Sequence, residues 1–137
     1  MPMKSDGFVD AVHARSREML EPLFAEDCRF LSPVVFAPYE GKEIVLTILA
    51  EGAFKVFDAD NFEYVYRFEN DDAAALIFRT SVGGREVDGL DQLTFDEDGL
   101  MTELKVMIRP LSGTMALKEA MGKRFEELGL VTPKVQS

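Results

Sequence analysis

The sequence predicts an α+β domain in which helices from the first half of the chain pack over a curved antiparallel sheet and enclose an apolar pocket. Two patterns carry this prediction. Apolar residues recur every three or four positions from Lys42 to Phe57, the period of a helix that covers a core. From Phe62 onward they alternate with polar residues, the period of a half-buried strand.

The composition indicates one folded domain over residues 1–137, because 47% of the residues are hydrophobic and 29% are charged. The formal net charge of −10 argues against nucleic acid or an anionic membrane as a partner. No apolar run approaches the roughly 20 residues that a bilayer requires. The first residues do not resemble a secretory signal and Cys28 is the single cysteine, so a cytoplasmic location is expected.

The first half of the chain is expected to be mainly helical. A first helix should end before Pro22, and Leu20–Ala25 should form a short second turn. A strand over Cys28–Val34 follows, and its proline places it at an edge or strand end. The helix over Lys42–Phe57 then presents one apolar face to whatever lies beneath it.

The second half is expected to be a four-stranded antiparallel meander from Phe62 to Arg109, followed by a helix. The predicted hairpin turns are Asn70–Asp72, Gly83-Gly84 and Asp96–Gly99.

The last helix, over Thr114–Leu128, has a clear end signal. Gly129 can adopt the left-handed conformation, Leu130 can make the hydrophobic contact of a Schellman cap, and Pro133 prevents continuation. The helix is therefore expected to stop at Leu128.

The turns set the register of the sheet and define one of its faces. The Gly83-Gly84 turn places Leu76 opposite Asp91, and a four-residue turn at Asp96–Gly99 places Leu104 opposite Asp91 on the next strand. Asp91 is then the single charge on an apolar face. The candidate pocket residues are Tyr39, Tyr64, Phe78, Gly89, Leu104, Val106 and Ile108.

An isolated carboxylate on an apolar face costs several kcal/mol unless it is paired or protonated. One interpretation makes Asp91 a pocket acid with a raised pKa, beside space that Gly89 opens. The other is a register error or a buried hydrogen bond to a loop. The candidate catalytic residues are Asp91 and Tyr66, which lies level with it in this register, although core packing is an alternative role for Tyr66.

The sequence indicates no cofactor and no metal. It has no glycine-rich phosphate loop, and its single histidine, His13, and single cysteine, Cys28, cannot form a ligand cluster.

Four segments, Leu23–Pro33, Tyr39–Glu43, Val87–Asp91 and Phe95–Gly99, together resemble the SnoaL-like branch of the nuclear transport factor 2-like superfamily. The resemblance covers most of the chain and rests on loops and patterning. It implies a cone-shaped α+β barrel with an internal pocket, commonly dimeric.

The resemblance also bears on chemistry. It implies that Asp91 corresponds to the protonated aspartic acid with which ketosteroid isomerases donate a hydrogen bond. Their general base corresponds to Ser32, and the last-strand carboxylate of related epoxide hydrolases and polyketide cyclases corresponds to Val106. Scytalone dehydratases use paired histidines, whereas this chain has only His13.

Two hypotheses follow. The first is a protein that binds a small apolar molecule without a complete catalytic set. The second is a cofactor-independent isomerase, cyclase or hydrolase in which Asp91 is the acid or hydrogen-bond donor, assisted by Tyr66 or Tyr39. A homodimer is expected through the outer sheet face, where Ile77, Leu90 and Met107 form an apolar stripe.

Overall fold

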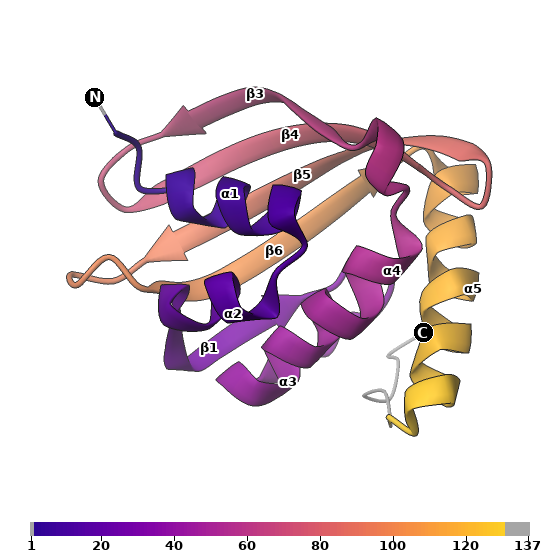
Figure 1. Ribbon diagram of the computed structural model, residues 1–137, viewed down its shortest axis with the longest axis horizontal. Helices are drawn as coiled ribbons and strands as arrows, with labels where there is room; N and C mark the ends of the chain where they lie inside the picture. The colour runs from indigo at the N-terminus through magenta and orange to yellow at the C-terminus, as the bar shows by residue number, and fades with distance from the viewer. Residues whose placement is uncertain (1, 131–137) are drawn as a thin grey trace.

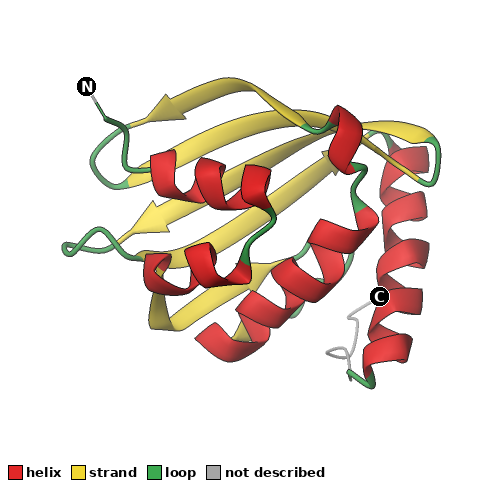
Figure 2. Cartoon of the chain, viewed as in Figure 1, coloured by secondary structure: helices red, strands yellow, loops and turns green. Residues whose placement is uncertain are grey.

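The computed structural model describes residues 2–130, which form a curved sheet with helices packed over one face and across one end (Figures 1 and 2). In chain order the elements are α1 (Asp6–Ala14), α2 (Arg17–Leu20), η1 (Glu21–Leu23), β1 (Phe24–Leu31), β2 (Tyr39–Glu40), α3 (Lys42–Thr47), η2 (Ile48–Ala53), α4 (Phe54–Val56), η3 (Ala59–Asn61), β3 (Glu63–Glu69), β4 (Ala73–Val82), β5 (Arg85–Phe95), β6 (Met101–Arg109) and α5 (Leu111–Leu128).

The six strands lie in the order β2-β1-β6-β5-β4-β3. Strands β3 to β6 form the predicted antiparallel meander. The expectation of a wholly antiparallel sheet is wrong, because β1 pairs in parallel with β6, with Phe30 beside Leu104. The long helical segment and strands β3 to β5 lie between these two strands in the chain. When the chain reaches β6, this strand lies beside β1 and runs in the same direction.

The register between β4 and β5 is as predicted, with Leu76 opposite Asp91. The register between β5 and β6 differs by two residues, since Asp91 lies opposite Val106 and not Leu104. The turn accounts for one residue, since Phe95 pairs with Met101 and not Leu100, and an irregularity between Thr94 and Phe95 accounts for the other. Within the turn the Asp96 carboxylate accepts hydrogen bonds from the backbone of Asp98 and Leu100, both at 2.9 Å. A shift of two leaves every side chain on its predicted face, because side chains alternate with period two.

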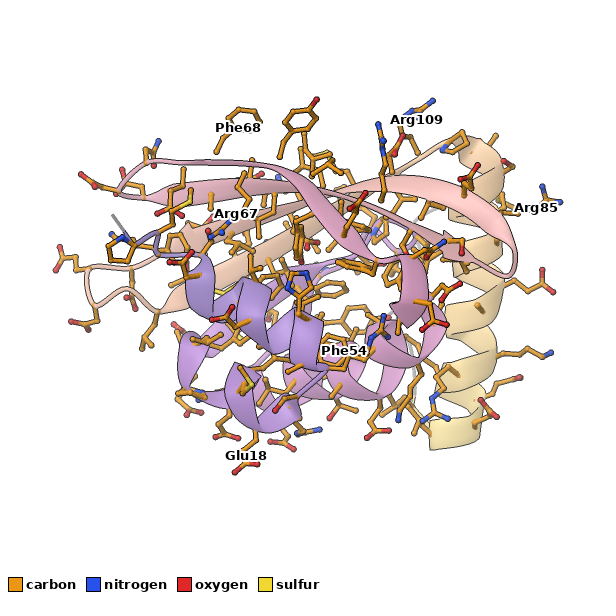
Figure 3. The ribbon with its side chains drawn as sticks, turned by 45° about the horizontal axis from the view of Figure 1, so that its top comes forward. Glu18, Phe54, Arg67, Phe68, Arg85 and Arg109 are labelled. Carbon is orange, nitrogen blue, oxygen red and sulfur yellow. The ribbon has the colours of Figure 1, made fainter. Side chains whose placement is uncertain are left out.

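A β-bulge in β3 changes which of its side chains face the helices. The pairing with β4 shifts between Tyr64 and Tyr66, so Tyr64 and Arg67 point inward while Tyr66 points outward. Figure 3 shows Arg67 on the helical side of the sheet and Phe68 on the opposite side. The inner face therefore carries an arginine that a strictly alternating strand would have placed outside.

The predicted helix over Lys42–Phe57 is nearly continuous, from α3 through the π-helix η2 to α4 at Val56. Strand β1 begins earlier than predicted, at Phe24, because α2 and η1 already end at Leu23.

Helix α5 begins three residues earlier than predicted, at Leu111, and lies across one end of the sheet (Figure 1). Its predicted Schellman cap is confirmed: Gly129 has φ +71° and Leu130 donates to the carbonyl of Phe125 at 2.9 Å. Pro133 lies outside the described residues.

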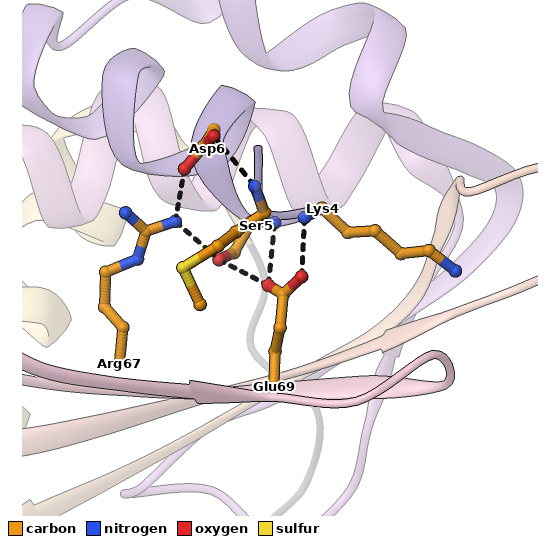
Figure 4. A network of polar contacts seen from close by, with 6 residues as sticks. Lys4, Ser5, Asp6, Arg67 and Glu69 are labelled. Atoms are coloured by element: carbon orange, nitrogen blue, oxygen red, sulfur yellow. Dashed lines mark hydrogen bonds and ion pairs between the residues drawn. The ribbon is translucent and has the colours of Figure 1, made fainter. Parts of the chain in front are cut away.

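A polar network holds the start of α1 against β3 (Figure 4). Glu69 accepts hydrogen bonds from the backbone of Lys4 and from the hydroxyl of Ser5, at 2.6 and 2.8 Å. Arg67 donates to Ser5 and to Asp6 at 2.8 and 2.7 Å, and this contact lowers the pKa of Asp6. The network positions α1 over the inner face of the sheet.

Candidate functional site

A cavity of about 240 Å³ lies between the inner face of the sheet and the helices. This volume lies below the roughly 300–1,000 Å³ of pockets for drug-sized ligands, so the cavity suits a smaller molecule. Aromatic side chains from helices, strands and loops form much of its wall: Phe8, Phe30, Tyr39, Phe54, Phe57, Phe62, Tyr64, Phe78 and Phe125. The cavity therefore offers mainly apolar contacts.

Asp91 lies in this wall and is only 6% exposed. Its Oδ2 accepts a hydrogen bond of 2.8 Å from the hydroxyl of Tyr64, which points inward on the N-terminal side of the bulge in β3. Burial raises the pKa of Asp91 to about 7, and the hydrogen bond from Tyr64 offsets part of that rise. Near neutral pH the carboxyl group can thus carry a proton in an apolar cavity.

Tyr64 is held in place by its aromatic neighbours. Its ring packs edge-on against Phe62 and Phe78, with centroids 5.2 and 6.1 Å away. Burial raises the pKa of Tyr64 well above its ordinary value, and the negative charge of Asp91 raises it further. Tyr64 is therefore a neutral donor throughout the physiological pH range.

Tyr39 brings a second hydroxyl to the cavity wall. Its ring packs between Phe30 and Phe125, with centroids 6.1 and 6.4 Å away. The hydroxyl is buried and has no hydrogen-bond partner among the described residues, and burial raises its pKa. An unpaired buried hydroxyl is costly, so this group has hydrogen-bonding capacity to spare.

The structure brings Asp91, Tyr39, Tyr64, Phe78, Leu104 and Val106 together in the cavity wall. Three other candidates lie elsewhere. Tyr66 is 58% exposed on the outer face, because the bulge reverses its orientation. Ile108 packs between the main core and a smaller cluster of Val82, Val87 and Leu117, and it does not line the cavity.

Gly89 does not open space for a ligand, contrary to expectation. A Cβ atom added there would lie 2.0 Å from the ring of Phe78, so that ring fills the space that glycine leaves. Gly89 thus shapes the cavity indirectly, by letting Phe78 lie flat against the sheet.

Several lining residues were missed, among them Arg15, Phe54 and Phe62. Arg15 follows α1 and Phe54 begins α4, and nothing local in the sequence relates these two to Asp91. Phe62 precedes β3, and its alternation with Tyr64 was an available signal. The apolar face predicted for residues 42–57 was an available signal, since Ile48 and Leu49 from that face line the cavity.

Asp91 is the only carboxylate among the described residues of the wall. Ser32, which the sequence resemblance aligns with the isomerase base, lines the cavity, and its Oγ accepts a hydrogen bond of 3.1 Å from the backbone of Val34. His13 is exposed, with its ring centroid 5.9 Å from that of Tyr64. A carboxylate pair that could divide acid and base roles is missing from this wall.

Within residues 2–130, no three His, Cys, Asp or Glu side chains converge as a metal site. Every helix in that range is too short or too polar to cross a bilayer.

The fold and the cavity define a class of protein, and a family comparison identifies it. The family model for the SnoaL-like domain matches residues 6–104, and the chain belongs to this family. This confirms the resemblance seen in the sequence. No curated protein matches the chain.

Solved structures agree with this assignment. A steroid delta-isomerase from Pseudomonas aeruginosa is 32% identical, with 91% of this chain and 90% of that chain covered and a TM-score of 0.85. An uncharacterized bacterial protein with a cystatin-like fold from Silicibacter pomeroyi is 28% identical, with coverages of 92% and 87% and a TM-score of 0.85. A SnoaL-like polyketide cyclase structure from Shewanella denitrificans, at 15% identity, 90% and 95% coverage and TM-score 0.61, shares the fold.

Proposed function

We propose that the chain binds a small, largely apolar molecule in this cavity and holds an acceptor oxygen of that molecule, such as a ketone, with the carboxyl proton of Asp91. The observation that carries the proposal is the buried Asp91–Tyr64 pair, 2.8 Å apart, in a wall of aromatic side chains. Tyr64 occupies Oδ2, and no other described residue hydrogen-bonds the carboxyl group. A protonated Asp91 can therefore donate to a ligand.

Binding without turnover is the better-supported form of this function. Proton abstraction from carbon needs a base as well as an acid, and Ser32 cannot supply one unaided at neutral pH. The second candidate is a double-bond isomerase, which the 32% identity to a steroid delta-isomerase favours. Conversion of a β,γ-unsaturated ketosteroid by the native chain, abolished in Asp91→Leu, would establish the isomerase instead.

The binding test uses the fluorescence of 2-acetylnaphthalene, which the chain does not obscure because it contains no tryptophan. At pH 6 the ketone should bind at least 10-fold more tightly than 2-ethylnaphthalene, since only the ketone accepts the proton of Asp91. In Asp91→Leu the two probes should bind alike. Equal binding of both probes by the native chain would contradict the proposed role of Asp91.

We also propose a cytoplasmic homodimer that has no nucleic-acid or membrane partner, consistent with the net charge of −10. Strand pairing aligns Tyr66, Ile77, Leu90 and Met107 in one row across the outer face. Tyr66 stacks on Phe68, and both rings are more than half exposed. An apolar row of this kind suits a self-complementary interface.

Light scattering tests the dimer directly. Leu90→Arg places a charge in the middle of the row and should shift the mass from dimer to monomer at tens of micromolar. Leu111→Arg is the matched control, because Leu111 is 77% exposed on α5 and not on the sheet face. A native monomer, or a dimer that survives Leu90→Arg, would refute this interface.

A further inference from the structure

Arg15 is a part-buried cation in the wall of a mainly apolar cavity, and ketone binding gives it no role. It follows the last residue of α1 and shares the lining with Phe8 and Val12 of that helix. Burial lowers the pKa of its guanidinium, although Asp58 and Asp60 partly oppose this effect. The charge is incompletely solvated, so an anion beside it would be stabilising.

The backbone of Arg15 is also unusual. Its φ of +51° lies in the left-handed region, and within residues 2–130 no other non-glycine residue has a positive φ. Glycine is the usual residue at this position after a helix because it has no Cβ to strain. Strain of this kind collects at functional sites, which makes the Arg15 side chain a candidate for a functional role.

The contacts of Arg15 leave much of its guanidinium group free. Its Nη1 donates to the carbonyl oxygen of Phe54, and no described residue forms an ion pair with it. The carboxylate of Asp58 is engaged elsewhere, accepting from the backbone of Asp60 at 2.9 Å and from Ser81 at 3.4 Å. The remaining N–H groups form a planar fork that matches a carboxylate.

We infer that Arg15 anchors an acidic group of the ligand, so that the cavity takes a small apolar carboxylate with an acceptor oxygen at its other end. This inference rests on the proposed function and adds the charge of the ligand to it. Asp91 holds the neutral oxygen, and Arg15 holds the anionic group. Lys118 also lines the cavity but is exposed, and it is the alternative cation that the test must separate from Arg15.

Two matched probe pairs test the inference at pH 6: 6-acetyl-2-naphthoic acid with its carboxamide, and 4′-acetylbiphenyl-4-carboxylic acid with its carboxamide. The naphthalene and biphenyl probes differ in length, so that one of the two pairs can match the distance between Asp91 and Arg15. The native chain should bind the acid at least 10-fold more tightly than the amide in one pair. Arg15→Gln, which keeps a donor for the Phe54 carbonyl, should bind the amide normally and lose the preference.

Lys118→Gln should retain the preference for the acid. Arg15→Gly should also lose it, without a fall in Tm, because glycine relieves the left-handed strain. An acid preference that is absent in the native chain or persists in Arg15→Gln would overturn the inference, as would equal weakening of acid and amide. Failure of the proposed function looks different, because 2-acetylnaphthalene would then have no advantage over 2-ethylnaphthalene.

Discussion

The Asp91→Asn variant is expected to gain up to about 4 kcal/mol of stability relative to the native chain as the pH rises from 4 to 8. Burial raises the pKa of Asp91 from 3.8 to about 7 in the folded state. Below pH 3.8 both folded and unfolded chains carry the proton. Between 3.8 and 7 only the unfolded chain ionises, so folding loses stability, at about 1.4 kcal/mol per unit of pKa.

Asparagine stays neutral throughout, so the variant escapes this loss while its side-chain oxygen can still accept from Tyr64. Denaturant unfolding of both proteins at several pH values measures the difference in their free energies of unfolding. The titration of the other carboxylates contributes equally to both proteins and cancels in this difference. Asp71→Asn, at an exposed turn position, is the control for the loss of one carboxylate charge.

Carboxyl-carbon NMR measures the same pKa directly, with an expected midpoint near 7. In Tyr64→Phe the midpoint should rise further, because the donated hydrogen bond favours the carboxylate. A midpoint at or below 3.8 in the native chain would show that Asp91 is solvated or paired with a cation.

Gly89→Ala is expected to destabilise the chain by about 1–3 kcal/mol, the usual cost of overpacking a core. The new methyl group would collide with the ring of Phe78, which is 1% exposed. That ring cannot move freely, because it stacks on Phe62 at 4.9 Å and meets Phe57 edge-on at 5.6 Å. Thermal and denaturant unfolding measure the loss.

Gly122→Ala is the matched control. No atom lies within 4 Å of the Cβ it would add, and alanine is a better helix former, so stability should rise by about 1 kcal/mol. In a double-mutant cycle, Phe78→Leu should recover part of the loss caused by Gly89→Ala. Independent effects of the two substitutions would mean that Phe78 does not occupy the space beside Gly89.

The central part of the site could be predicted because it depends on local geometry. A Gly83-Gly84 turn requires positive φ at both residues, and both have it, at +55° and +81°. This short turn fixes the pairing of β4 with β5, which places Asp91 opposite Leu76 on the apolar face. The error of two residues on the next strand left that face unchanged, because side chains alternate with period two.

Tertiary contacts decided the rest. The bulge in β3 lies where Tyr64 meets the core and Arg67 meets the start of α1, and a regular alternation of aromatic residues gives no sign of it. The parallel pairing of β1 with β6 joins segments at opposite ends of the chain. Arg15 reaches the cavity only because α1 folds over the sheet.

The sequence by itself thus determined the α+β class, the meander and the inward position of Asp91, because turn geometry and side-chain alternation act over a few residues. Only the tertiary structure decided that Tyr64 and not Tyr66 contacts Asp91, that Phe78 fills the space beside Gly89, and that Arg15 lines the cavity. These features depend on how distant segments pack, and packing is a property of the whole fold.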